Sequence, residues 1–361
     1  MTDLLDPPAL PGSTGLRASS EATARVAGAR RRRGRRARTV TMVLVALILI
    51  VFAVSLMVGH RFYPPEAIIR VILGETVPGA SFTVGELRLQ RAVLAVVAGL
   101  SFGLGGVAFQ TMLRNPLASP DVIGISSGAS AGAVFAIIVL SAGTAQTGAF
   151  AIATGLAVAL LVYLLAFRGG SAGTRLILIG IGIAAMGNSV INYLLSTAGQ
   201  WDLQEAMRWL TGSLNSASWG TAVPTLLSVL VLGPVLVGLS RSLGALRLGD
   251  DTASALGVRV GVTRIGVIVA AVGLIAVATA ATGPIAFVAF LSGPIAARIV
   301  GPGAAPIVPA GLVGALLVLV ADLAGQYAFG TRYPVGVVTG VLGAPYLLYL
   351  IIRTNRTGGS L

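Results

Sequence analysis

The chain has 361 residues, of which 55% are hydrophobic and only 10% are charged. Soluble domains carry about 25% charged residues, so this chain has too few charges to cover the surface of a water-soluble core. Its net charge of +13 comes from 25 basic residues, all of them arginine, and 12 acidic residues. These values exclude an ordinary soluble protein and indicate that lipid is the outer solvent.

Missing residue types exclude several kinds of chemistry. A phosphate-binding P-loop needs a lysine, and the chain has none, so any ATP hydrolysis must occur on another polypeptide. The absence of cysteine excludes disulfides and thiolate metal sites, and His60 is the single histidine. We therefore expect a chain that is not an enzyme, with no catalytic residue, no metal site and no cofactor of its own.

Residues 1–38 begin with a stretch rich in Pro, Ser, Ala and Gly and contain nine arginines, seven of them within 30–38. The composition predicts a disordered tail. The arginine cluster is open to a nucleic-acid interpretation, but its place directly before an apolar run favours the positive-inside anchor of a first membrane span. A cleaved signal peptide fits poorly, because its apolar region is only about 7–15 residues long.

Charge-free intervals along residues 39–361 predict an all-α polytopic permease domain, since about 20 apolar residues cross a hydrocarbon core as a helix. The interval 122–167 is long enough for two spans with a turn near Gly143 and Gly148, and the interval 265–297 is divided at Gly283 and Pro284. The count is about ten transmembrane helices, expected at 39–59, 92–113, 122–167 (two), 176–197, 221–239, 265–297 (two), 299–321 and 334–352.

Arginine positions test this arrangement. With the N-terminus inside, 19 arginines fall in cytoplasmic segments and six fall outside, which together make the 25 of the chain. This asymmetry follows the positive-inside rule. We therefore expect a multi-pass protein of the cytoplasmic membrane with both termini in the cytoplasm.

Few polar residues lie inside the spans. Asp322 is the one carboxylate there, and it is interpreted either as a structural group bonded to a neighbouring helix or as a proton carrier. Gln110, Asn188 and Asn192 are polar positions in otherwise apolar helices. Hydrogen bonding between helices is the simpler interpretation, and lining a substrate path is the alternative.

Two predicted cytoplasmic loops carry motifs. Residues 248–258 have the pattern of a short helix, with acidic residues in the first turn and Gly257 at the stop. The loop between the second and third spans contains a rigid turn with two prolines, formed by Arg114, Asn115, Pro116 and Pro120.

Taken together, the motifs of the chain resemble those of the FecCD/BtuC-like permease family. The resemblance covers about residues 88–352 and rests on these residues and strings: Arg88-Leu89-Gln90-Arg91, Gln110, residues 114–120, Gly124-Ile125-Ser126-Ser127-Gly128-Ala129, Trp209-Leu210-Thr211-Gly212-Ser213-Leu214, Leu248-Gly249-Asp250, Leu256-Gly257-Val258, Gly283-Pro284-Ile285-Ala286-Phe287-Val288, Ala321-Asp322, Pro334-Val335-Gly336-Val337-Val338-Thr339 and Gly343-Ala344-Pro345.

The resemblance implies the permease fold of a type II ABC importer. Its expected partners are a second permease subunit (identical or not), two cytoplasmic ATPases that bind ATP and Mg, an extracytoplasmic substrate-binding protein and membrane lipid, with no nucleic acid. It also implies that a coupling helix meets the ATPase through Leu248, Gly249, Asp250, Asp251, Thr252, Ala253, Leu256, Gly257 and Val258.

The family's outward-facing arginines match Arg88 and Arg91, which are expected to dock acidic residues of the binding protein. Arg332, which stands where a glutamate is common, joins this predicted patch, and Gln326 stands where an arginine is common. Many members have Pro-His in the eighth span where this chain has Gly293-Pro294, so the path lacks an imidazole.

Because the path lacks an imidazole that could ligate haem, a ferric siderophore is favoured as substrate over haem, and cobalamin is the third candidate. The rival from another class is a proton-coupled carrier that uses Asp322 and no ATPase.

Overall fold

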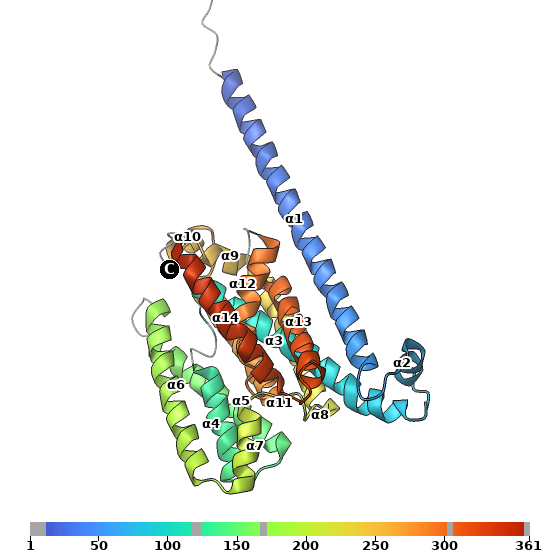
Figure 1. Ribbon diagram of the computed structural model, residues 1–361. Coiled ribbons are helices and arrows are strands. Elements are labelled where there is room, and N and C mark those ends of the chain that lie inside the picture. The colour runs from blue at the N-terminus through green and yellow to red at the C-terminus, as the bar shows by residue number, and fades with distance from the viewer. Residues whose placement is uncertain (1–11, 117, 119–123, 167–171, 302–305, 357–361) are drawn as a thin grey trace, which may run out of the picture.

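The computed structural model describes residues 12–116, 118, 124–166, 172–301 and 306–356, and within these ranges the chain is helical, without a β-strand (Figure 1). The elements are α1 (Gly12–Met57), α2 (Pro65–Ile72), the π-helix η1 (Ser81–Arg88), α3 (Leu89–Met112), α4 (Ile125–Ile138), α5 (Thr144–Ala166), α6 (Ala172–Thr197), α7 (Gln200–Leu210), α8 (Trp219–Gly238), α9 (Ser240–Leu246), α10 (Asp250–Ala255), α11 (Val260–Thr282), α12 (Val288–Val300), α13 (Ile307–Tyr327) and α14 (Val335–Arg356).

Seven helices of the described chain are long and apolar enough to cross a membrane, and three shorter apolar helices accompany them. The long helices are α1, α3 (continuous with η1), α5, α6, α8, α11 and α13, and the shorter ones are α4, α12 and α14. Their order along the chain matches that of the ten predicted spans. The prediction of an all-α polytopic membrane protein is therefore confirmed.

Several predicted boundaries are wrong by a few residues. The turn in the interval 122–167 lies between Ile138 and Thr144, so Gly148 is inside α5. The eighth span begins as a helix at Val288 instead of Pro284, because the backbone has φ of +70° at Gly283 and +64° at Phe287. The ninth begins at Ile307 instead of 299, because Gly301, with φ of +88°, ends α12. A right-handed helix does not continue through positive φ.

The segment before the first span also differs from the prediction. The structure continues α1 back to Gly12, through residues expected to be disordered. Alanine and arginine dominate the second half of this segment, and both are strong helix formers. The first half of α1 projects from the body (Figure 1), while the remainder packs against α13 and α12. Arg36 Nε anchors it by donating to Ile299 O at 3.0 Å.

The centre of the bundle is α3, which packs against α8, α11, α12 and α13. Nearly every side chain in its second half is buried. The contact with α13 is between backbones: a Cβ on Gly99 would lie 2.5 Å from Gly314 O, and a Cβ on Gly314 would lie 2.2 Å from Gly99 O. Small residues permit such close approach of helices in lipid, where packing replaces the hydrophobic driving force.

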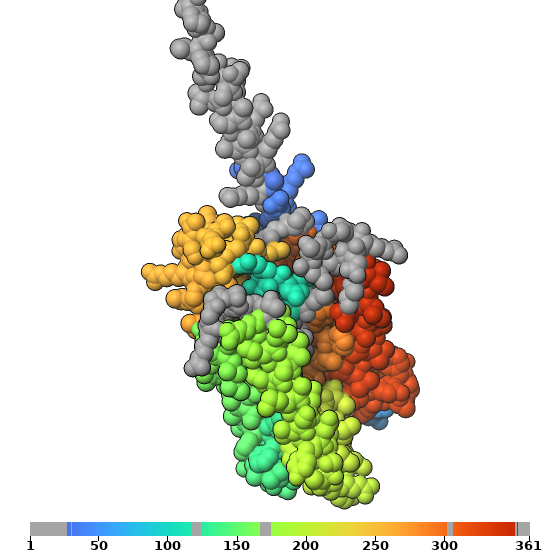
Figure 2. Space-filling model, turned by 90° about the vertical axis from the view of Figure 1, so that its left-hand side faces the viewer, coloured from blue at the N-terminus to red at the C-terminus, as the bar shows by residue number. Residues whose placement is uncertain are grey.

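The bundle has two distinct ends. The helices α9 and α10 and the C-terminal end of α14 lie at the end from which α1 projects, while α2 and α7 lie at the opposite end (Figure 1). Figure 2 shows the α9–α10 region as a protrusion beside the point where α1 emerges. We call the end from which α1 projects the α1 end and the opposite end, with α2 and α7, the α2 end.

Candidate functional site

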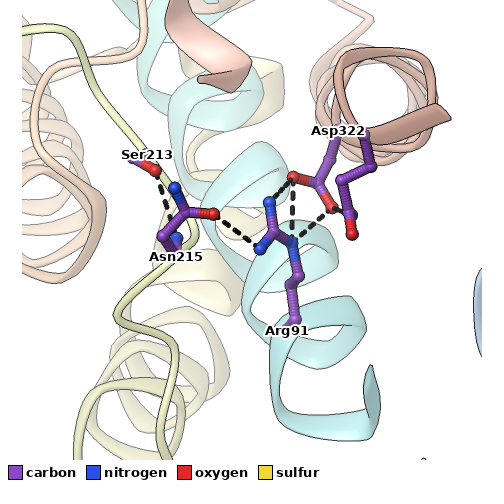
Figure 3. A network of polar contacts seen from close by, with 5 residues as sticks. Arg91, Ser213, Asn215 and Asp322 are labelled. Atoms are coloured by element: carbon purple, nitrogen blue, oxygen red, sulfur yellow. Dashed lines mark hydrogen bonds and ion pairs between the residues drawn. The ribbon is translucent and has the colours of Figure 1, made fainter. Parts of the chain in front are cut away.

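At the α2 end, Arg91 of α3 and Asp322 of α13 form a bidentate ion pair (Figure 3). Arg91 Nη2 lies 2.7 Å from Asp322 Oδ1, and Arg91 Nε lies 2.9 Å from Asp322 Oδ2. The pair is largely sheltered, with exposed side-chain fractions of 20% for Arg91 and 7% for Asp322. Asp322 therefore bonds a neighbouring helix, as the structural interpretation expected, and Arg91 is not a free outward-facing charge.

Further hydrogen bonds extend this pair to a loop. Arg91 Nη1 donates to Asn215 Oδ1 at 2.8 Å, and Gln326 Nε2 donates to Asp322 Oδ2 at 2.7 Å. The backbone N–H of Asn215 in turn donates to Ser213 Oγ at 3.1 Å. Gln326 thus supports the carboxylate from one turn farther along α13. The network joins α3, α13 and the segment between α7 and α8.

Arg88 also has an intramolecular role. Its Nη1 donates to Leu56 O at 2.7 Å and Met57 O at 3.1 Å, and its Nη2 donates to Arg61 O at 2.8 Å. Its guanidinium lies over the Tyr63 ring, 5.1 Å from the centroid. The last carbonyls of a helix lack partners within the helix, so Arg88 closes the C-terminal end of α1.

Arg332 is the most exposed of the three predicted docking arginines. Its Nη2 lies 2.6 Å from His60 Nε2. A guanidinium can only donate, so the imidazole nitrogen accepts. The structure brings Arg88, Arg91 and Arg332 to the same end of the bundle, but it gives each of them a partner within the chain.

Three of the family-like strings meet at this end through their backbones. Ser213 N donates to Thr282 O at 2.7 Å, and Gly336 N donates to Gly212 O at 3.1 Å. A Cβ on Gly283 would lie 2.2 Å from Trp209 O. The glycines at 212, 283 and 336 are therefore needed because main chains touch, and the junction leaves no room for side chains.

A cavity of about 300 Å³ adjoins this junction. Its lining includes Glu205, Arg208 and Trp209 of α7, Thr147 of α5 and Asn215. The sequence analysis did not single out Glu205 or Arg208, because their position after a span gave no signal of a shared cavity. Within the described residues, no three His, Asp or Glu side chains form a group that could hold a metal ion.

At the α1 end, the predicted short helix is present as α10, inside the range 248–258. Gly257, with φ of +82°, ends it: Val258 N donates to Ala253 O and Gly257 N to Ser254 O, the two bonds of a Schellman motif. Ala253 is fully buried, whereas Leu248 and Leu256, which flank the helix, are each 64% exposed. This short helix thus presents two large apolar side chains outward.

The two loop motifs meet at this end through Asp250. One carboxylate oxygen pairs with Arg114 Nη2, and the other lies 2.7 Å from Arg264 Nη2. Arg114 Nε also donates to Leu246 O at 2.7 Å. The sequence analysis named Arg114 and Asp250 separately and missed Arg264 of α11, because nothing in the sequence indicates which of the nearby arginines faces the carboxylate.

The turn after α3 explains how Arg114 is placed. Arg114 N donates to Thr111 O, and Asn115 N donates to Gln110 O, which is again a Schellman ending. Arg114 occupies the left-handed position, with φ of +54°, where glycine is usual. Pro116 is exposed in the following turn, and Pro120 lies outside the described residues.

Gln110 satisfies a carbonyl that a proline leaves without a partner. Pro294 in α12 has no N–H for Phe290 O, four residues earlier, and Gln110 Nε2 donates to that oxygen at 2.9 Å. A Cβ on Gly293 would lie 1.9 Å from Gln110 Oε1. Gln110 therefore has the helix-bonding role of the simpler interpretation.

Asn188 and Asn192 behave differently. Both are exposed on α6, on a face that also carries the exposed side chain of Ile181. Neither asparagine bonds another helix within the described part of the chain. An exposed amide is costly against hydrocarbon, so this face requires a polar or protein neighbour.

The chain is similar to a known transport family and to several of its members. The chain matches the FecCD transport family over residues 47–353. It is 37% identical over 310 residues to the achromobactin transport system permease protein CbrC of Dickeya dadantii, covering 85% of this chain and 89% of that protein. It is 36% identical over 290 residues to the ferric enterobactin transport system permease protein FepG of Escherichia coli, covering 80% and 88%.

A cobalamin import system permease protein, BtuC of Halobacterium salinarum, is 33% identical over 275 residues, covering 75% of this chain and 74% of that protein. Among solved structures, the inward-facing conformation of a metal-chelate type ABC transporter superposes with a TM-score of 0.79 and 25% identity. The match covers 88% of this chain and 99% of that one.

Proposed function

Because the chain belongs to the FecCD transport family, we propose that it is the permease subunit of an ABC importer that carries a ferric siderophore across the cytoplasmic membrane. The observation that carries this proposal is α10. A short helix whose flanking leucines are 64% exposed is suited to insert into a groove of a separate ATPase, because burial of apolar side chains drives association. No residue of this chain hydrolyses ATP in this scheme.

The proposal sets the orientation of the bundle. The α1 end carries α10 and the exposed arginines of α1, and the positive-inside rule places such an end in the cytoplasm. The α2 end then faces outward with Arg88, Arg91 and Arg332. Both termini of the chain are cytoplasmic in this orientation.

The exposed face of α6 supports a central path. Asn188 and Asn192 are uncompensated on one side of a helix that is long and apolar enough to cross the membrane. A second permease copy across a water-filled path would solvate both amides and cover the apolar residues beside them. We therefore assign this face to the substrate path between two permease subunits.

We propose that the binding protein docks at the α2 end, where Arg332 is the exposed arginine and Arg88 and Arg91 bond partners within the chain. Arg332 provides the cleanest test, because it is exposed and its recorded contact is with His60. Arg332→Glu is expected to weaken binding of the cognate binding protein in a salt-dependent manner, since exposed charges act mainly by steering. Equal affinity and equal salt dependence for the variant and the wild type would remove Arg332 from the patch.

The ferric siderophore is proposed from the names of the relatives, which include a ferric enterobactin transport system and a siderophore transport system of Bacillus subtilis. Deleting the gene and supplying defined iron sources tests it: growth is expected to fail on one ferric siderophore and to be restored by the intact gene. Growth that fails only on haem as iron source, or only where cobalamin is required, would replace the substrate while keeping the importer.

A second experiment separates the importer from a proton-coupled carrier. In vesicles holding the permease with its ATPase and binding protein, uptake of the labelled chelate is expected to require ATP and to stop with a catalytically inactive ATPase. Uptake that persists with the inactive ATPase and depends on a proton gradient would support the carrier. The ion pair of Asp322 with Arg91 argues against that carrier, because both carboxylate oxygens are bound by the guanidinium of a neighbouring helix.

A further inference from the structure

Asp250 occupies a different position from the rest of the α10 segment. Leu248, Asp251 and Leu256 are exposed, whereas Asp250 is only partly exposed and lies against the bundle. Both of its carboxylate oxygens bond arginines of this same chain, Arg114 and Arg264. Its carboxylate is therefore directed toward the membrane helices, and the side chains available to an ATPase are the neighbours.

The two arginines belong to helices at the centre of the fold. Arg114 lies directly after α3, which packs against α8, α11, α12 and α13. Arg264 lies in the second turn of α11, which packs against α3, α4, α5 and α8, and its side chain is only 18% exposed. A displacement of Asp250 thus acts on the ends of the two helices that contact most of the bundle.

Arg114 is held rigidly enough to transmit such a displacement. It occupies the left-handed position that ends α3, and its guanidinium bonds both Asp250 and the last carbonyl of α9, Leu246 O. Arginine can make two such bonds at once because its donors form a planar fork, which lysine lacks. The side chain therefore joins the α9–α10 segment to α3 at two points.

The α10 helix itself has little else to fix it. It has six residues, too few for a helix that is stable alone, and one of them, Ala253, is fully buried. Within the described chain, the ion pairs of α10 are those of Asp250 with Arg114 and Arg264. These pairs are about 40% exposed at Asp250 and 41% at Arg114, so they add little to global stability.

From this geometry we infer that Asp250 is a positioning residue that transmits the movement of α10 to α3 and α11 through Arg114 and Arg264. This inference rests on the proposed importer function, because it assumes that an ATPase moves α10. Asp250 does not contact ATP, the substrate or the reacting phosphate. Its effect is that the adjoining ends of α3 and α11 move together with α10.

The test uses the full transporter in proteoliposomes, with the ATPase, the binding protein and the labelled ferric siderophore that supports growth. Asp250→Asn removes the charge that both arginines bind. We expect ATP hydrolysis within about twofold of wild type and uptake per ATP lowered about tenfold, a typical size for a coupling between sites. A merely structural role would lower assembly and hydrolysis together.

A matched pair of arginine variants provides the control. Arg264→Gln breaks one arm of the linkage and leaves Arg114 bonded, so uptake per ATP should fall about threefold. Arg259→Gln removes an exposed arginine five residues earlier whose side chain bonds nothing within the described part of the chain, and uptake per ATP for this variant should equal that of wild type. The double variant of Asp250 and Arg264 should be no worse than Asp250→Asn, because the Asp250 change alone already removes the ion pair with Arg264.

Two outcomes would overturn the inference: uptake per ATP within twofold of wild type for Asp250→Asn, or an equal loss for Arg259→Gln and Arg264→Gln. If Asp250→Asn does not assemble, the comparison of Arg264→Gln with Arg259→Gln decides alone. Failure of the proposed function is distinguishable, because the wild-type complex itself would then show no ATP-dependent uptake.

Discussion

The two ends of the bundle use the same chemistry, an aspartate paired with arginine, in opposite settings. At the α2 end, the Arg91–Asp322 pair is sheltered, with exposed fractions of 20% and 7%. At the α1 end, Asp250 and Arg114 are 40% and 41% exposed. Removing one partner of a sheltered pair strongly destabilises the fold, whereas an exposed pair contributes little to stability. The pair at the α2 end is therefore expected to contribute more to stability than the pair at the α1 end.

The largest expected effect is at the sheltered pair. Asp322→Asn leaves the Arg91 guanidinium without its counter-charge, and we expect a loss of about 3 kcal/mol of stability. The measurement is thermal unfolding in detergent. Replacing both partners by apolar residues, with Arg91→Met and Asp322→Leu together, should be less damaging than the single change. A double variant that is less stable than Asp322→Asn would contradict this account of the α2 end.

The second comparison uses glycines with positive φ at the two ends. Gly283→Ala at the α2 end adds a Cβ that would lie 2.2 Å from Trp209 O, and we expect a loss of about 2–3 kcal/mol from overpacking and backbone strain. Gly257→Ala at the α1 end meets nothing within 4 Å and should lose only about 1 kcal/mol, through its left-handed backbone. If Gly283→Ala and Gly257→Ala lowered the melting temperature equally, the proposed difference in packing between the two ends would be wrong.

A third prediction concerns the last turn of α3, where Gln110 bonds α12. Gln110→Leu removes the donor to Phe290 O, which Pro294 leaves without a backbone partner. We expect a loss of about 1–3 kcal/mol, the range for a buried carbonyl left unsatisfied. Gln110→Glu places an acceptor opposite the same carbonyl and should be at least as damaging. A stable Gln110→Leu variant would indicate that another donor reaches Phe290 O.

The smallest effect on stability is expected at the exposed pair. Asp250→Asn should lower the free energy of unfolding by no more than about 1 kcal/mol, although uptake per ATP falls strongly. The unfolding curve of the same purified variant used for transport provides the check. A stability loss as large as that of Asp322→Asn would mean that both ends are structural, and the contrast between them would disappear.

Particular residues show how far the sequence could be interpreted. The spans followed from charge-free intervals, and α10 followed from its acidic first turn and Gly257, because these signals are local. The errors of the sequence-based prediction were also local. Positive φ at Phe287 moved the start of α12, and the segment after Gly12 is helical where its Pro-, Ser-, Ala- and Gly-rich composition suggested a disordered tail.

The charged side chains were less predictable. Arg91 was expected to face a partner protein, yet its guanidinium is bound by Asp322, 231 residues away in the chain. Asn188 and Asn192 share a face by spacing alone, but their exposure depends on which neighbours cover α6.

The sequence by itself determined that this is a multi-pass membrane protein with about ten apolar segments, and it predicts that the arginines gather on one side and that ATP is hydrolysed on another chain. These properties depend on composition and on hydropathy along the chain. Only the tertiary structure decided which charges meet. Arg114 and Asp250 are 136 residues apart, and Arg88 reaches the end of a helix about 30 residues before it. Ion pairs depend on distances of a few ångströms between side chains, and no local pattern encodes such distances across a folded bundle.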